Sequence, residues 1–177
     1  MNKPKHIELG FIIIVPENNP KLAEITASSL KFKYSGSPFI FVVTESISDM
    51  CYDDISKIGI VFRGGNTYSS LISLGMMHAP SEWNMIIISG TQMRSNAHQK
   101  YSCFIDSPKD ILFPIVDRKA NFIEGTLNGI MFNKFAYEEL GNMPNEISDM
   151  QECKAIWGYK ACNLGYKFKA LVGAGLS

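Results

Sequence analysis

Polar residues follow four apolar segments in the first half of the chain. The segments have the β-branched, apolar composition of buried strands: FIIIV (11–15), FIFVV (39–43), IVF (60–62) and MIII (85–88). The residues after them carry carboxylate, amide, guanidinium and hydroxyl groups, or are proline and glycine. They are Pro16, Glu17, Asn18, Glu45, Arg63, Gly65, Asn66, Ser89, Gly90 and Thr91.

Parallel strands of an open sheet end at one edge, and α/β proteins bind their ligands there. We therefore expect these polar residues to meet at that edge. Carboxylates, amides, an arginine and backbone N–H groups suit the base, ribose and phosphates of a nucleotide. The same residue types are also ordinary in turns, and that alternative stays open. The glycines form neither GxGxxG nor a phosphate loop that ends in Gly-Lys-Ser/Thr.

Strands and helices alternate along the segments that must position these groups. Residues 19–32 have Leu22, Ile25, Ala27 and Leu30 at helical spacing. A short acidic segment separates the second and third strands, and residues 66–79 predict a helix capped by Asn66 or Thr67. This order predicts an α/β fold with a mostly parallel central sheet flanked by helices. The second half predicts short strands and a proline-broken loop (102–117), a strand and a helix (122–140), and a helix, a turn and a final strand (146–173).

Composition limits the class of protein. With 177 residues, 46% of them hydrophobic, we expect a single domain. Lys plus Arg and Asp plus Glu total 17 each, so non-specific binding to nucleic acid is not expected. The longest apolar run, FIIIV, is far shorter than the roughly 20 residues of a membrane span. The N-terminus lacks a signal-peptide pattern, and the four cysteines lack CxxC spacing, so we expect reduced thiols and a cytoplasmic location.

The order of the segments resembles the GT-A fold of glycosyltransferases, most closely the large inverting family often numbered two. IIIVPENN, FVVTES and FRGGNTYSSLISLGMMHAPSEWNMIIISG are similar to its nucleotide-binding half. FIEGTLNGIMFNKFAYEELGNMP resembles the segment that supports donor and acceptor, and EISDMQECKAIWGYKACNLGYKFKAL the segment that supplies the catalytic base. The resemblance implies one GT-A-like domain over residues 1–177, with a nucleotide-binding half (1–95) and an acceptor and catalytic half (96–177).

The resemblance also marks a departure at the expected metal site. Ser89-Gly90-Thr91 stands where the family has Asp-x-Asp, and no histidine follows His98. Hydroxyls are poor ligands for Mn²⁺ or Mg²⁺, so the usual metal ligands are absent and we expect weak or no metal dependence. Cationic side chains would then neutralise a donor diphosphate, with Arg63, Arg94 and Lys134 as candidates. A solvated loop position for Arg94 is the alternative.

An inverting sugar transfer needs a carboxylate that accepts the proton of the acceptor hydroxyl. Asp149 and Glu152 lie in the matching acidic segment and would share one helix face, with Asp149 slightly preferred. They would alternatively cap that helix and offset its dipole. Candidate acceptor or sugar contacts are Glu124, Gly125, Asn128 and Trp157, against a β-bulge for the glycine-containing patch and core packing for the tryptophan.

The resemblance thus implies a glycosyltransferase that moves a sugar from a nucleotide-diphosphate donor, a UDP-sugar, to a glycan, lipid or protein acceptor with inversion. The alternative is a catalytically inactive nucleotide-sugar-binding module of the same fold. A third reading is a non-sugar α/β protein such as a nucleotidyltransferase, but VPENNPKLAE lacks the glycine-rich, basic signature of that class. Assembly into a homo-oligomer stays open.

Overall fold

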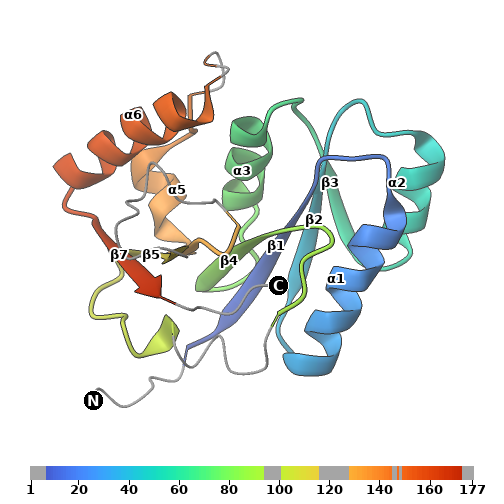
Figure 1. Ribbon diagram of the computed structural model, residues 1–177, viewed down its shortest axis with the longest axis horizontal. Coiled ribbons are helices and arrows are strands. Elements are labelled where there is room, and N and C mark those ends of the chain that lie inside the picture. The colour runs from blue at the N-terminus through green and yellow to red at the C-terminus, as the bar shows by residue number, and fades with distance from the viewer. Residues whose placement is uncertain (1–6, 94–100, 116–127, 145–146, 148, 173–177) are drawn as a thin grey trace.

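The computed structural model describes residues 7–93, 101–115, 128–144, 147 and 149–172 (Figure 1). Within them, seven strands form one sheet in the order β3-β2-β1-β4-β6-β5-β7. Only β6 runs antiparallel to its neighbours β4 and β5, while the other neighbouring strands are parallel. The predicted single α/β domain with a mostly parallel sheet flanked by helices is confirmed. The elements are β1 (Leu9–Val15), α1 (Pro20–Lys33), β2 (Phe39–Val43), α2 (Asp49–Ser56), β3 (Ile60–Arg63), α3 (Tyr68–Met77), β4 (Trp83–Ile88), β5 (Asp110–Ile115), β6 (Met131–Asn133), α5 (Phe135–Leu140), α6 (Met150–Asn163) and β7 (Lys167–Val172).

Helices cover both faces of the sheet, and this explains the continuous apolar runs of its strands (Figure 1). All seven residues of β1 are buried. Phe11 and Ile13 face α1 and α2, whereas Ile12 and Ile14 face α3, α5 and α6. The central strands are therefore fixed on both sides, and the loops at their ends are held on a rigid base.

Helix α1 buries only part of the predicted face, because Ala27 and Leu30 are buried whereas Leu22 is partly buried and Ile25 is exposed. Its buried residues are Ala23, Thr26, Ala27 and Leu30, while Ile25 is 42% exposed. This face also has helical spacing, but it includes a threonine, which the apolar pattern passes over. The burial of Thr26 is important because its side chain contacts the loop at the end of β4, as described below.

One further element was not predicted, and one predicted strand contains a proline. The short acidic segment forms α2, because Ser48 caps it by accepting a hydrogen bond from Cys51 N at 3.3 Å and because Cys51 and Ile55 are buried one turn apart. The predicted loop and strand of residues 102–117 are both present, with Pro108 in the loop before β5, but β5 continues through Pro114 without a break. In the described residues β5 pairs with β6 at Leu112 and Met131, and Pro114 lies opposite Leu171 of β7.

Candidate functional site

The parallel strands β1, β2, β3 and β4 end level with one another. The register pairs Ile14 with Ile88, Val15 with Val43, and Val43 with Arg63. The polar residues that follow these strands therefore lie together along one edge of the sheet, as the sequence indicates. This edge, called the carboxyl edge below, carries Pro16, Glu17, Asn18, Glu45, Arg63, Gly65, Asn66, Ser89, Gly90 and Thr91.

At the β2 and β3 end, the backbone is joined by two hydrogen bonds. Glu45 N donates to Gly65 O at 3.0 Å, and Gly64 N donates to Val43 O at 3.1 Å. Gly65 has φ +73°, and a Cβ placed on it would lie 2.1 Å from Ser70 Oγ. Glycine is needed here, because only glycine allows both this backbone conformation and this close approach to the start of α3.

Arg63 is already engaged by the start of α2. Its guanidinium lies 3.3 Å from the Asp49 carboxylate, donates to Ile47 O, and sits 5.3 Å from the centre of the Tyr52 ring. Asn18 adds a second tie, because its Oδ1 accepts a hydrogen bond from Ser48 N at 2.8 Å. Two residues predicted to contact a nucleotide thus also fasten α2 to the carboxyl edge.

The Ser89–Thr91 turn uses its own backbone donors within the protein. Ser89 N donates to Ile14 O at 2.9 Å, and Thr91 N donates to Ile88 O at 3.1 Å. Gly90 N donates to Leu22 O at 3.1 Å and to Thr26 Oγ1 at 2.9 Å. The expectation that backbone N–H groups bind phosphate is therefore wrong for this turn, and its side-chain hydroxyls are the groups that stay available.

Asn128 joins the second half of the chain to this turn. Its Oδ1 accepts a hydrogen bond from Ile88 N at 3.0 Å, and its Nδ2 donates to Thr91 Oγ1 at 2.9 Å. Behind it, the buried Tyr101 hydroxyl donates to Gly129 O at 2.8 Å. Burial raises the pKa of Tyr101, so this hydroxyl keeps its proton and stays a donor. Asn128 thus lies with the predicted donor residues.

The residues present do not fit a divalent cation at this turn. Ser89 and Thr91 offer neutral hydroxyls, and Thr91 Oγ1 already faces the amide hydrogens of Asn128. Hard cations such as Mg²⁺ prefer charged oxygen ligands. Across the described part of the chain, no three His, Cys, Asp or Glu side chains gather in a way that would hold a metal ion.

The two candidate bases lie at the start of α6. Asp149 is its N-cap and accepts a hydrogen bond from Gln151 N at 2.8 Å, while Glu152 lies in the first turn. Both side chains are exposed. Figure 1 shows α3 and α6 both beginning towards the top of the view, where β1 and β2 also end. Asp149 thus caps α6, as the alternative interpretation has it. Because its carboxylate is exposed, it can still act as a base.

The remaining predicted residues do not join this group. Trp157 is only 4% exposed and packs edge-on against Phe168 in the core, so it has no free face on which a sugar could stack. Lys134 lies at the opposite edge, because β6 is antiparallel and Lys134 N donates to Glu82 O just before β4. The other predicted positions lie outside the described residues: Arg94, Glu124 and Gly125.

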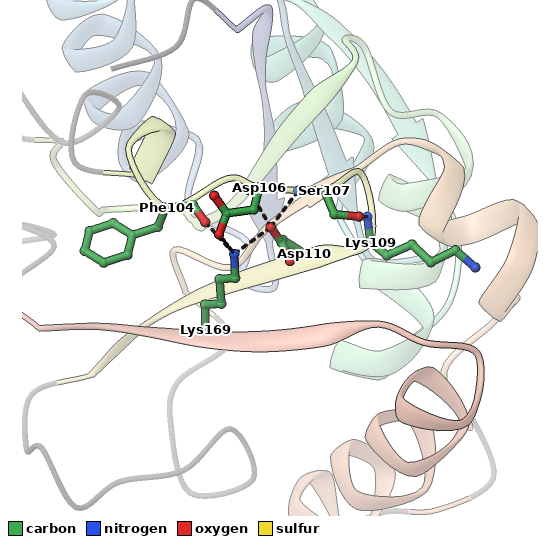
Figure 2. Close-up of polar contacts among 6 residues, drawn as sticks. All are labelled: Phe104, Asp106, Ser107, Lys109, Asp110 and Lys169. Atoms are coloured by element: carbon green, nitrogen blue, oxygen red, sulfur yellow. Dashed lines mark hydrogen bonds and ion pairs between the residues drawn. The ribbon is translucent and has the colours of Figure 1, made fainter. Parts of the chain in front are cut away.

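An ion cluster around the buried Asp110 lies away from the carboxyl edge, at the start of β5. Figure 2 shows the Lys169 ammonium facing three oxygens: Asp110 Oδ2 at 2.7 Å, and Asp106 Oδ2 and Phe104 O at 2.8 Å. Burial alone would lower the pKa of Lys169, but its bonds to Asp106 and Asp110 raise it above its usual range. Asp110 also accepts the backbone N–H groups of Asp106 and Ser107 at 2.7 and 2.9 Å. The cluster fastens residues 104–110 to β7, so its role is structural.

Sequence reasoning missed two residues that hold the Ser89–Thr91 turn. Thr26 both accepts from Gly90 N and donates to Thr91 O at 3.0 Å, and Tyr101 supports Gly129. Thr26 could have been identified from its helical spacing, which puts it on the same face of α1 as Ala23, Ala27 and Leu30. No local pattern marks Tyr101, because its partner lies 28 residues along the chain.

Comparison with known proteins supports the fold. Neither protein families nor curated proteins match the sequence. Among solved structures, residues 1–349 of S. aureus TarS superpose with a TM-score of 0.64 at 13% identity, over 92% of this chain and 58% of that one. The TarS complex with UDP-GlcNAc gives a TM-score of 0.61 at 15% identity, over 92% of this chain and 56% of that one.

A cytidylyltransferase from Leptospira borgpetersenii gives a TM-score of 0.63 at 17% identity, over 96% of this chain and 78% of that one. The chain therefore has a nucleotide-diphospho-sugar transferase-like fold of the GT-A type. It spans little more than half the length of the TarS fragment. In the described residues, no helix has the length and apolar character needed to cross a membrane.

Proposed function

We propose that the chain binds a nucleotide sugar along the carboxyl edge and transfers the sugar to an acceptor. The observation that carries the proposal is the convergence of four polar loops on one edge of a GT-A-type sheet. TarS, which shares this fold, has been solved with UDP and with UDP-GlcNAc, and this favours a UDP-sugar as donor. Inversion at the anomeric carbon follows from the family that the sequence resembles.

The spacing of the strands fits an extended nucleotide. Neighbouring strands lie about 4.8 Å apart, so the three spacings from β3 to β4 span about 14 Å. The proposal places the diphosphate at Ser89 and Thr91, and the ribose and base towards Glu45, Gly65 and Asn66. Arg63 lies at the base end in this arrangement, where Asp49 and Tyr52 already orient its guanidinium.

Diphosphate binding in this proposal uses hydroxyl donors and no metal. The partly exposed hydroxyls of Ser89 and Thr91 would donate to phosphate oxygens, and bonds from neutral donors to a charged acceptor are stronger than neutral pairs. Arg94, three residues past Thr91, is the proposed cation for the remaining charge. No step in the proposal passes through a divalent metal.

Asp149 is the proposed general base, with Glu152 as its competitor. Asp149 would take the proton of the acceptor hydroxyl as that oxygen attacks the anomeric carbon and the nucleoside diphosphate leaves. Its carboxylate has a second oxygen beyond the one that accepts from Gln151 N, and the side chain is exposed. Capping α6 and accepting a proton are therefore compatible.

The test compares Asp149→Asn with Glu152→Gln in a transfer assay. Asparagine caps a helix about as well as aspartate, so the fold and donor binding should survive. Transfer should fall by about 10²- to 10⁴-fold if Asp149 is the base. Full activity in Asp149→Asn with loss in Glu152→Gln would move the role to Glu152.

A nucleotide-sugar-binding module without turnover is the second candidate. It is favoured by the engaged state of the predicted site residues, because Asp149 caps α6 and Arg63 pairs with Asp49. Donor binding by the unmutated protein without transfer to glycan, lipid or protein acceptors would select this candidate. The similarity to a cytidylyltransferase keeps the nucleotidyltransferase class in the same panel, where CTP and a sugar phosphate serve as substrates.

A further inference from the structure

Asn128 controls which way the hydrogen-bonding groups of Thr91 face. The backbone N–H of Ile88 lies 3.0 Å from the Asn128 side chain, and an N–H can only be received by the carbonyl oxygen of the amide. This fixes the orientation of the amide, so its NH₂ group is directed at Thr91 Oγ1, 2.9 Å away. Thr91 Oγ1 is therefore an acceptor inside the protein.

The hydrogen of the Thr91 hydroxyl is left for a ligand. A threonine hydroxyl has one hydrogen to donate, and no acceptor for this hydrogen is found among the described residues. The backbone carbonyl of Thr91 is already taken by the Thr26 hydroxyl at 3.0 Å. The side chain is partly exposed at the carboxyl edge. The turn thus presents a donor to solvent, and the partial positive charge of the amide lies behind it.

We propose that Asn128 is a specificity-determining residue that makes the Ser89–Thr91 turn a site for an oxyanion and unsuitable for a metal cation. The inference deepens the proposed function, on which it rests, by naming the ligand chemistry at this turn. A phosphate oxygen accepts the hydroxyl hydrogen, whereas a cation would meet that hydrogen, with the Asn128 NH₂ group that donates to Thr91 Oγ1 behind it. Tyr101 supports the arrangement by holding the adjacent Gly129 carbonyl at 2.8 Å.

Asn128→Asp reverses this polarity with almost no change in shape. An aspartate still accepts from Ile88 N but has no hydrogen for Thr91, so the Thr91 hydroxyl turns to donate to it and is lost to the ligand. Binding of inorganic pyrophosphate in EDTA, measured by calorimetry, should weaken by at least about 10-fold, or 1.4 kcal/mol. Binding of Mn²⁺ alone, measured without nucleotide, should strengthen.

Three further variants distinguish the loss of the Thr91 hydroxyl donor from misfolding and from the added negative charge. Thr91→Val removes the hydroxyl and should weaken pyrophosphate binding as Asn128→Asp does, while Thr91→Ser restores the hydroxyl and should recover most of it. Asn142→Asp makes the same charge change in the segment after α5, where the exposed Asn142 side chain accepts from the Tyr137 hydroxyl at 3.1 Å, and should have little effect. Thermal unfolding of each variant shows that the comparison is made between folded proteins.

The outcomes separate this inference from the proposed function. Pyrophosphate binding by the unmutated protein, with no binding of any nucleotide sugar, would refute the function and leave the oxyanion site standing. Nucleotide-sugar binding that is equally tight in Asn128→Asp would refute the role of Asn128 and leave the function standing. Failure of the unmutated protein to bind pyrophosphate in EDTA, or tighter binding of Mn²⁺ than of pyrophosphate, would overturn the inference.

Discussion

Replacing Thr26 with valine tests whether α1 holds the Ser89–Thr91 turn. Thr26 is fully buried, and its hydroxyl accepts from Gly90 N at 2.9 Å and donates to Thr91 O at 3.0 Å. Valine has nearly the same shape but places a methyl group where the hydroxyl was. The change removes both hydrogen bonds without opening a cavity.

The expected loss of stability follows from these two bonds. Each contributes about 0.5–1.5 kcal/mol net, so the pair is worth about 2 kcal/mol. Gly90 N keeps its second acceptor, Leu22 O at 3.1 Å, so Thr26→Val adds no further cost for an unsatisfied N–H group. For a chain of this length, 1 kcal/mol shifts Tm by about 2–4 °C, so Thr26→Val should lower Tm by about 4–8 °C.

Thermal and urea unfolding measure this loss, and Thr44→Val provides the control. Thr44 also follows a strand at the carboxyl edge, but within the described residues its hydroxyl bonds only to the exposed Ser46 hydroxyl, at 3.2 Å. Its substitution should cost less than about 0.5 kcal/mol. If Thr26→Val unfolds at the same temperature as the unmutated protein, the turn is not held from α1 and the account of its rigidity fails.

Two other predictions concern Gly65 and the Lys169 cluster. Gly65→Ala should lower the free energy of unfolding by about 2 kcal/mol, because it combines backbone strain at φ +73° with a clash at Ser70 that breaks the cap of α3. The control, Gly36→Ala, has φ +90° but lies in open space, so it should cost about 1 kcal/mol. Equal losses of stability in urea unfolding would contradict the close contact between Gly65 and Ser70. Lys169→Met should cost about 3 kcal/mol near neutral pH, because it leaves the buried Asp110 carboxylate without its cation. The pKa of Lys169 is raised in the folded protein, so the stability that Lys169 contributes is complete below its unfolded pKa near 10.4. This stability is lost as the pH rises through the folded pKa. The difference in unfolding free energy between Lys169→Met and the unmutated protein should therefore shrink above about pH 10.5. Lys57→Met, which breaks an exposed pair with Asp54, should change little, and a loss in Lys169→Met that is independent of pH would refute the assignment.

The central sheet was predictable because its signal is local. Apolar runs such as residues 11–15 and 85–88 are buried on both faces, so composition alone marks them as parallel strands. Their shared edge then follows from the geometry of parallel strands. The polar residues after them were found for the same reason, and Thr67 rather than Asn66 proved to be the cap of α3.

The remaining features depend on contacts between distant segments. Helix α2 was missed because eight residues carry too little periodicity to stand out, although Ser48 and Asp49 form a recognisable start. The use of the turn's backbone N–H groups inside the protein depends on Leu22 and Thr26, which lie more than 60 residues away in the chain. In contrast, core packing of Trp157 was predicted as the alternative to a sugar contact, and its edge-on packing against Phe168 of β7 confirms that alternative.

The most direct check on a metal-independent nucleotide-sugar site is titration of the unmutated protein with UDP and with UDP-GlcNAc in EDTA, and again in Mn²⁺. We expect binding in EDTA, visible by calorimetry and as a rise in Tm, with less than a 10-fold gain in affinity on adding Mn²⁺. A ligand at 100 times its Kd should stabilise the fold by about 2.7 kcal/mol, which is readily measured. Absence of binding to either ligand at millimolar concentration, or a 100-fold gain with Mn²⁺, would contradict a metal-independent nucleotide-sugar site at the carboxyl edge.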